Sequence, residues 1–219
     1  IYYYTGNNTK AIDYHLKSLK VSEEIKDKVR IGTSMNNIGS VYKSNPVTVD
    51  KALEYFLKAL PIFEAVKYDA GLGTASGNIG EIYFDRKQYD KALPYFLTAL
   101  KMYAGTIDAT FPLTMLAKIY AERADFQTAH YYHNQAIDIA DKLDADFELT
   151  QSLLGLALTQ TKEGKIRDAI TTYKRAETIG KSVNARKEIK EVYENLSKSY
   201  SALGDFKNAY TYETLFSAI

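Results

Sequence analysis

Two histidines, His130 and His133, stand three positions apart in the segment HYYH. On a helix this spacing puts both imidazoles on one face, where they could bind a metal ion. No third ligand lies in register with them. In the chain's internal pattern, His133 also takes a position that Phe56, Phe96 and Tyr173 take elsewhere. We therefore expect a core histidine and no metal site.

Two glycine-containing segments only partly match phosphate-binding loops. GLGTASGNIG at 71–80 lacks the G-x-G-x-x-G spacing and follows no predicted strand, and close helix packing explains it better. KEGKI at 163–167 lacks both the upstream glycine and the hydroxyl residue that follows lysine in a phosphate loop. Cysteine is absent, which excludes thiolate chemistry. The sequence predicts a protein that is not an enzyme and uses no cofactor.

Charge and hydropathy argue against several partner classes. The 219 residues include 28 basic and 27 acidic side chains, so no bulk field favours nucleic acid or anionic lipid. No apolar run approaches the roughly 18–20 residues that span a bilayer, and no signal peptide heads the chain. The first residue is Ile1, so we expect a fragment or processed chain. Its compartment stays open between the cytoplasm and an extracytoplasmic sensor domain of a membrane-anchored protein.

The chain repeats itself about every forty residues. YDKALPYFLTALKMY at 89–103 and VDKALEYFLKALPIF at 49–63 are identical at nine of fifteen positions. The alanine of KAL, called the anchor below, recurs at Ala11, Ala52, Ala92, Ala129, Ala169 and Ala209. A second small residue stands 12 or 13 positions before five anchors, at Gly39, Gly80, Ala117, Ala157 and Ser197. Such self-similarity indicates a repeat architecture.

Each repeat contains two predicted helices. Apolar residues recur at spacings of three and four on both sides of a short polar break, and strict alternation is missing, so no strand is expected. The breaks include TGNN at 5–8, KEGK at 162–165 and LGDF at 203–206. Small residues let two helices approach closely. One helix pair cannot bury its apolar faces alone, so the pairs must stack on each other.

Two prolines fall inside predicted helices. We expect Pro94 in the first turn of its helix, where a missing amide donor is tolerated. Pro61 falls nine residues past its anchor, where a kink or an early helix end is expected.

In these features the chain resembles the tetratricopeptide repeat family, in a long-helix version with about forty residues per unit. Gly80, Tyr83 and Ala92 match its signature positions, as do Gly204 and Ala209. The resemblance covers essentially the whole chain. It implies an all-α fold, a right-handed α-solenoid of about 5.5 repeats in a single domain. The expected units are 1–27, 28–68, 69–106, 107–143, 144–183 and 184–219.

The chain departs from the family pattern at several positions. Lys87 and Ala124 replace the turn glycine, and Gln160 replaces an aromatic residue. The last unit ends at Ile219 without a following helix, so its apolar face, which includes Leu215 and Phe216, needs a cap.

The resemblance implies a partner-binding surface on the first helix of each repeat, along a concave groove. The inward positions lie six and two before the small residue, one after it and four after it. The first three are Thr33, Asn37, Ser40, Thr74, Asn78, Glu81, Phe111, Met115, Lys118, Gln151, Gly155, Leu158, Glu191, Asn195 and Lys198. Asparagine holds the middle position in three of five units and could bind an extended peptide backbone. Alternatively, these asparagines cap or bridge adjacent helices.

The groove changes from polar through apolar to charged along the chain. Some relatives hold a carboxyl-terminal tail with a lysine three residues before the small position. Here that position holds Asn36, Gly77, Thr114, Leu154 and Glu194. None is basic, which disfavours recognition of a carboxylate tail.

The leading hypothesis is a non-enzymatic scaffold that binds a protein or peptide. The resemblance implies the sensory or regulatory repeat domain of a larger bacterial signalling protein. The alternative is a homo-oligomerisation module that pairs two copies through end faces and brings fused output domains together. An enzyme is the least supported reading. We expect no nucleic-acid binding and no membrane insertion by this segment.

Overall fold

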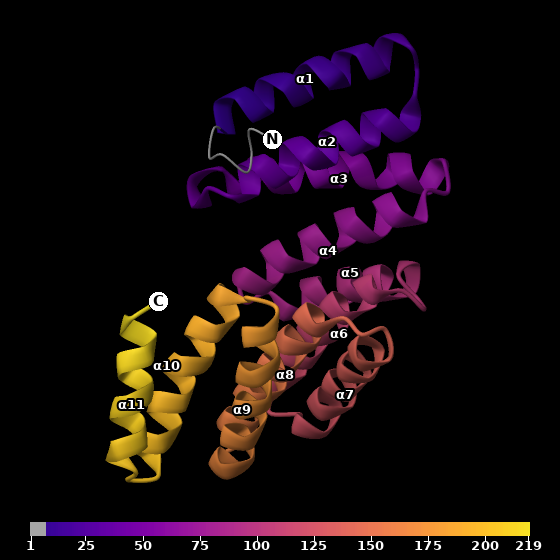
Figure 1. The fold of residues 1–219 in the computed structure, drawn as a ribbon. Helices are drawn as coiled ribbons and strands as arrows, with labels where there is room; N and C mark the ends of the chain where they lie inside the picture. Colours follow the sequence, from indigo (N-terminus) through magenta and orange to yellow (C-terminus); the bar gives the residue numbers. More distant parts are fainter. Residues whose placement is uncertain (1–7) are drawn as a thin grey trace. The chain divides into compact units, whose positions relative to one another are not determined.

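The computed structural model of the chain describes residues 8–219, which form eleven α-helices, two short 3-10 helices and no strand (Figure 1). This confirms the all-α prediction. Tyr2 and Tyr3, and most of the TGNN segment, lie outside the described residues. The helices are α1 (Asn8–Glu24), α2 (Lys28–Lys43), α3 (Val49–Ala65), α4 (Asp69–Asp85), α5 (Tyr89–Met102), α6 (Thr110–Glu122), α7 (Phe126–Lys142), α8 (Asp146–Lys162), α9 (Ile166–Ser182), α10 (Arg186–Ala202) and α11 (Phe206–Ser217), with η1 (Pro46–Thr48) and η2 (Ile107–Ala109).

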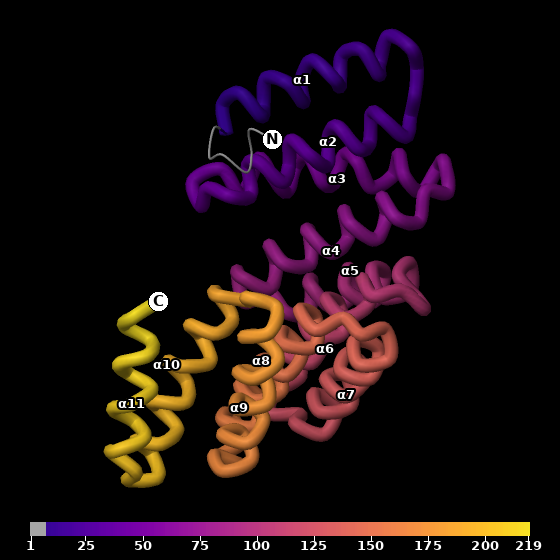
Figure 2. Tube along the Cα trace, viewed as in Figure 1, coloured from indigo at the N-terminus to yellow at the C-terminus, as the bar shows by residue number. Residues whose placement is uncertain are grey.

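Consecutive helices pack as hairpins, as the tube in Figure 2 shows. We call α2, α4, α6, α8 and α10 the first helices, and α1, α3, α5, α7, α9 and α11 the second helices. Each second helix from α3 onward packs against the first helix that precedes it. The fold is an α-solenoid of helix pairs. No helix within residues 8–219 is both long and apolar enough to cross a membrane.

The chain divides into two compact units, which meet between Ala104 and Gly105. Unit 1 contains α1 to α5, and unit 2 contains α6 to α11 with η2. The division falls within AGTID at 104–108, where the repeat interval is three residues short. The irregularity in the sequence thus coincides with the boundary between the units.

Close contact between small residues and aromatic rings holds each helix pair together. A Cβ atom added to Gly39 would lie 2.7 Å from Cε1 of Phe56, and one added to Gly80 would lie 2.9 Å from Cε1 of Phe96. Both rings are fully buried. Glycine is therefore required where α2 meets α3 and where α4 meets α5, because a methyl group would force the helices apart. The anchor alanines are buried as well.

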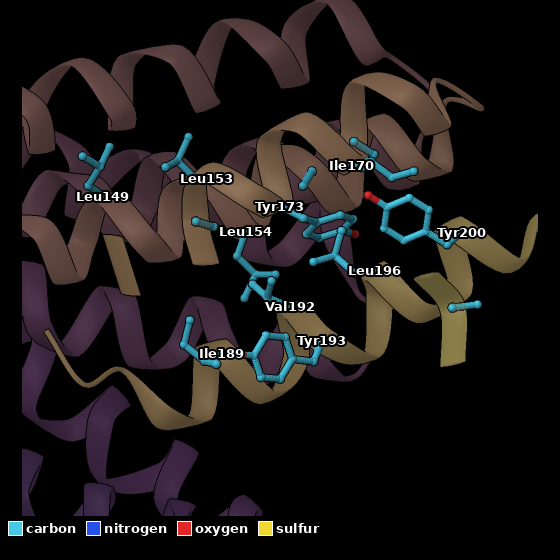
Figure 3. Packing of buried hydrophobic residues seen from close by; sticks show 14 of the residues in the cluster. Leu149, Leu153, Leu154, Ile170, Tyr173, Ile189, Val192, Tyr193, Leu196 and Tyr200 are labelled. Atoms are coloured by element: carbon cyan, nitrogen blue, oxygen red, sulfur yellow. The ribbon is translucent and has the colours of Figure 1, made fainter. Parts of the chain in front are cut away.

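Successive repeats share one core in unit 2. Figure 3 shows side chains from α8, α9 and α10 meeting in a single cluster, with Tyr173 and Leu196 fully buried. Because this cluster joins α9 of one repeat to α10 of the next, the pairs stabilise each other by stacking. Four stacked tyrosine pairs add a regular contact within the repeats: Tyr42–Tyr55, Tyr83–Tyr95, Tyr120–Tyr132 and Tyr200–Tyr212, with ring centroids 5.7–5.8 Å apart. In the repeat of α8 and α9, Gln160 stands at the aromatic position, and its side-chain oxygen is buried without a partner among residues 8–219.

The structure differs from the prediction at Pro94, and of the two alternatives for Pro61, a kink or an early helix end, it excludes the early end. α3 continues past Pro61 to Ala65, so the expected early end is wrong. Pro94 is the sixth residue of α5 and lies in the second turn rather than the first. Both prolines are exposed, so the carbonyl that loses its amide donor can bind water instead. This exposure explains why the helices tolerate them.

The turns that precede α5, α7, α9 and α11 each use one residue in the left-handed region. Gly164 and Gly204 have φ of 86° and 76°, and at the same repeat position Lys87 and Ala124 have φ of 57° and 59°. A side chain in this region costs about 1 kcal/mol relative to glycine. Lys87 and Ala124 therefore adopt the conformation of the glycine that they replace, with some strain.

We predict that Ala124→Gly stabilises unit 2 by about 0.5–1 kcal/mol, because relief of left-handed strain outweighs the added freedom of the unfolded chain. Thermal denaturation should show a rise of a few degrees. The matched reverse change, Gly204→Ala, should lower the transition temperature by a similar amount. A lower transition temperature for Ala124→Gly would contradict the strain argument.

Candidate binding surface

The first helices lie directly beside each other within each unit. α2 contacts α4 in unit 1, and α8 contacts both α6 and α10 in unit 2. Their solvent-facing sides form what we call the first-helix face of each unit. The residues predicted to bind a partner all belong to these five helices.

In unit 1, a lysine joins the two first helices across this face. Nζ of Lys43 on α2 donates to Oδ1 of Asn78 at 2.8 Å and pairs with Oε2 of Glu81 at 2.6 Å, both on α4. Asn78 thus bridges adjacent helices, which was one of the two alternatives left open by the sequence. Lys43 was not singled out. It occupies the fourth inward position, four residues after Gly39, and reading that position would have found it.

The other polar groups of unit 1 are partly engaged by their own helices. The hydroxyls of Thr33, Ser40 and Thr74 donate to main-chain carbonyls one turn earlier, at 2.8, 3.0 and 2.8 Å. Thr74 also lies 2.8 Å from the hydroxyl of Tyr103. The half-buried amide of Asn37 forms no hydrogen bond within residues 8–219. It is therefore available to a partner.

In unit 2, the first-helix face is more apolar. Phe111 is 42% exposed near the start of α6. Leu158 on α8 is half-buried and packs against the core, while Lys118 is half-buried. Met115 is only 6% exposed because α8 packs directly against α6, so it supports the fold and is poorly placed to touch a partner. Gly155 is buried against His133.

Polar pairs also link neighbouring first helices in unit 2. Nε2 of Gln151 on α8 donates to Oε1 of Glu188 on α10 at 3.0 Å. Lys162 on α8 pairs with Glu122 on α6 at 2.5 Å. Like the Lys43 contacts, each of these pairs links the first helices of two consecutive repeats. We call such a link a rung. Sequence spacing did not reveal the rungs of unit 2, because they depend on the offset between adjacent helices.

The α10 side of this face is charged. Nδ2 of Asn195 donates to the main-chain oxygen of Glu191 at 2.8 Å, and Lys198 pairs with Glu194 one turn away. Burial raises the pKa of the Tyr173 hydroxyl to about 12, and the nearby Glu191 charge adds to this rise. The three asparagines of the predicted row therefore differ, since Asn78 bridges helices, Asn195 binds its own helix and Asn37 is unengaged.

Each histidine of HYYH has one ring nitrogen within hydrogen-bond distance of another side chain. His133 is fully buried, as predicted, and its Nε2 lies 2.9 Å from Oγ1 of Thr159, while Nδ1 is buried without a partner. Nε2 of His130 lies 2.7 Å from Oε2 of Glu163. Burial lowers the pKa of His133 to about 3, with smaller effects from the charges of Lys118 and His130. Residues 8–219 contain no group of three His, Cys, Asp or Glu side chains that could hold a metal ion.

Comparison with known families agrees with this arrangement. Residues 49–105 match the family model described as tetratricopeptide repeat. This match covers about a quarter of the chain, from α3 to α5. Comparison with curated protein sequences found no match.

Several solved structures share this repeat fold. BtubC (BKLC) from P. vanneervenii aligns with a TM-score of 0.80 at 17% identity, over 96% of this chain and 90% of that one. The quorum sensor NprR from B. thuringiensis, in its apo form, aligns with a TM-score of 0.78 at 19% identity, over 94% of this chain and 59% of that one. A Rap protein complexed with competence and sporulation factor gives a TM-score of 0.73 at 16% identity, over 99% and 60%. At these identities the likeness shows the fold alone, and the chain spans about three fifths of the last two proteins.

We predict that Lys43→Met lowers the free energy of unfolding of unit 1 by about 1 kcal/mol, because it leaves Asn78 and Glu81 without their shared, partly buried cation. Urea denaturation provides the measurement. Lys58→Met is the matched control, since Lys58 pairs with Glu54 on an exposed helix surface, where solvent screens the interaction, and should matter much less. Equal effects of the two changes would show that the rung adds nothing.

We also predict that acid destabilises unit 2 through His133. The pKa is about 6.5 in an unfolded chain and about 3 in the fold. The contribution of neutral His133 is therefore complete above pH 6.5 and is lost as the pH falls toward 3. Between pH 7 and pH 4.5 the loss should reach about 2–3 kcal/mol.

The comparison is urea denaturation of the parent and of His133→Phe at both pH values. Phenylalanine is a suitable replacement because Phe56 and Phe96 occupy the same repeat position. The parent should lose about 2–3 kcal/mol more than the variant on acidification. If both lose the same stability, then His133 does not control the acid response.

Proposed function

We propose that the chain is a non-enzymatic scaffold that binds a segment of a protein or peptide on its first-helix faces. The observation that carries this proposal is the direct contact between consecutive first helices, which makes one continuous surface in each unit. The surface of unit 1 carries an unengaged amide, Asn37, and the surface of unit 2 carries an exposed aromatic ring, Phe111. Aromatic anchors with hydrogen-bonding groups around them are typical of peptide-binding surfaces.

The two faces suit different parts of a partner. The face of unit 1 presents hydroxyls, an amide and the Lys43 rung, which favour main-chain hydrogen bonds of an extended segment. The face of unit 2 presents Phe111 and the edge of Leu158, which favour an apolar side chain of the partner. Glu191 and Lys198 offer charged contacts on α10. We infer a partner with separate polar, apolar and charged stretches.

We further propose a sensory or regulatory role within a larger bacterial signalling protein. Support comes from the solved structures with this fold, one named as a quorum sensor and one complexed with competence and sporulation factor. Both proteins are longer than this chain, so a fused output domain belongs to the proposal and not to the observed fold.

A scaffold role without catalysis fits the surroundings of the two histidines of HYYH. His133 is inaccessible within the core, and His130 is held by Glu163. The first-helix faces present contacts that hold helices together rather than a nucleophile beside a base. A peptide or protein segment is therefore a better match than a small substrate.

The test is a selection of peptides from a displayed library on the 219-residue chain, followed by calorimetry of the best binder. We predict that Phe111→Ser and Asn37→Ala each weaken binding, by about tenfold for the aromatic ring and threefold for the amide. Tyr131→Ser is the control, because Tyr131 is 60% exposed on the second helix α7. Binding that depends on Tyr131 but not on Phe111 or Asn37 would contradict the proposal.

A further inference from the structure

Helix α11 presents a face that other second helices bury. Among the helices of unit 2, α11 packs against α10 and lies at the edge, as Figure 1 shows. Phe206 is 71% exposed and Tyr210 is 76% exposed. The residues at the same two repeat positions in α3, α7 and α9 are half-buried or buried: Val49, Leu53, Phe126, His130, Ile166 and Ile170. In α3, α7 and α9 this face meets the first helix of the next repeat.

One residue type on α11 departs from the pattern of the earlier repeats. Glu213 stands four residues after the anchor Ala209, where Phe56, Phe96 and Tyr173 are buried in earlier repeats. The face also differs from a polar terminal cap, since two aromatic rings are exposed on it.

The pattern on α11 is complementary to itself. Lys207 lies three residues before Tyr210, and Glu213 lies three residues after it. Both charged side chains are exposed, and neither forms an ion pair within residues 8–219. If two α11 helices pack antiparallel about a two-fold axis at Tyr210, Lys207 of each copy meets Glu213 of the other. The two tyrosine rings then pack together at the axis, with Phe206 beside them.

We propose that α11 is a dimerisation face, and that its partner is α11 of a second copy of this chain. In the two-fold arrangement Lys207 and Glu213 form two ion pairs per dimer, and the exposed rings of Phe206 and Tyr210 are covered. This surface is separate from the first-helix faces, so the inference stands or falls independently of partner binding there. A contact between two single helices is small, and we expect a dissociation constant on the order of 10–100 µM.

The experiment is analytical ultracentrifugation of the 219-residue chain from about 1 to 500 µM, a range that brackets this constant. We expect a reversible monomer–dimer equilibrium. Lys207→Glu alone and Glu213→Lys alone should each raise the dissociation constant at least tenfold, because each creates two like-charge contacts per dimer. The double variant with both changes should return to within about threefold of the parent.

Two further variants separate this face from others. Tyr210→Ser should weaken the dimer about tenfold, and Lys101→Glu, an exposed change on α5, should leave it unaltered. Circular dichroism of every variant verifies the helical fold. The proposal is overturned by a chain that stays monomeric over the whole range. It is equally overturned by a dimer that ignores the single charge reversals or is not restored by the double one. The first result favours a different helix as occupant, and the second favours a different dimer surface.

Discussion

The close contact of a small residue with a buried side chain is the constraint on which the packing of each helix pair depends. At Gly39 and Gly80 the neighbouring phenylalanine ring leaves no room for a methyl group. The paired helices therefore sit at the closest distance that their backbones allow, and the ring is enclosed from all sides. In the later repeats Ala117, Ala157 and Ser197 take this position, so the glycine contact belongs to the pairs α2–α3 and α4–α5. The close packing of each pair decides which side of each first helix stays open to solvent, and hence which side chains a partner can reach.

The sequence predicted the parts of the fold that depend on local spacing. The forty-residue period located the anchor alanines and the small residues, and it placed His133 in the core because Phe56 and Phe96 hold the same position. The sequence predicted less well those features that depend on how one helix packs against another, such as the burial of a side chain or the end of a helix. Met115 is buried although it takes an inward position, and α3 continues past the exposed Pro61 to Ala65. Neither effect is visible in the residue pattern of a single helix.

The candidate site shows the same division between what spacing reveals and what packing decides. Helical periodicity identified the side of each first helix that faces away from its partner helix. It did not identify Lys43 as the link between Asn78 and Glu81, nor the pairing of Gln151 with Glu188. These rungs take up polar groups that look free in the sequence, and they hold consecutive repeats in register. As a result, Asn37 and Phe111 become the distinctive groups of the two faces, one polar and one apolar.

The central claim is that a partner binds on the first helices and leaves the second helices uncovered. Amide hydrogen exchange of the chain, with and without a selected peptide, tests it most directly. The account predicts that added protection is confined to α2, α4, α6, α8 and α10. Protection that centres instead on α3, α5, α7 or α9 would contradict it.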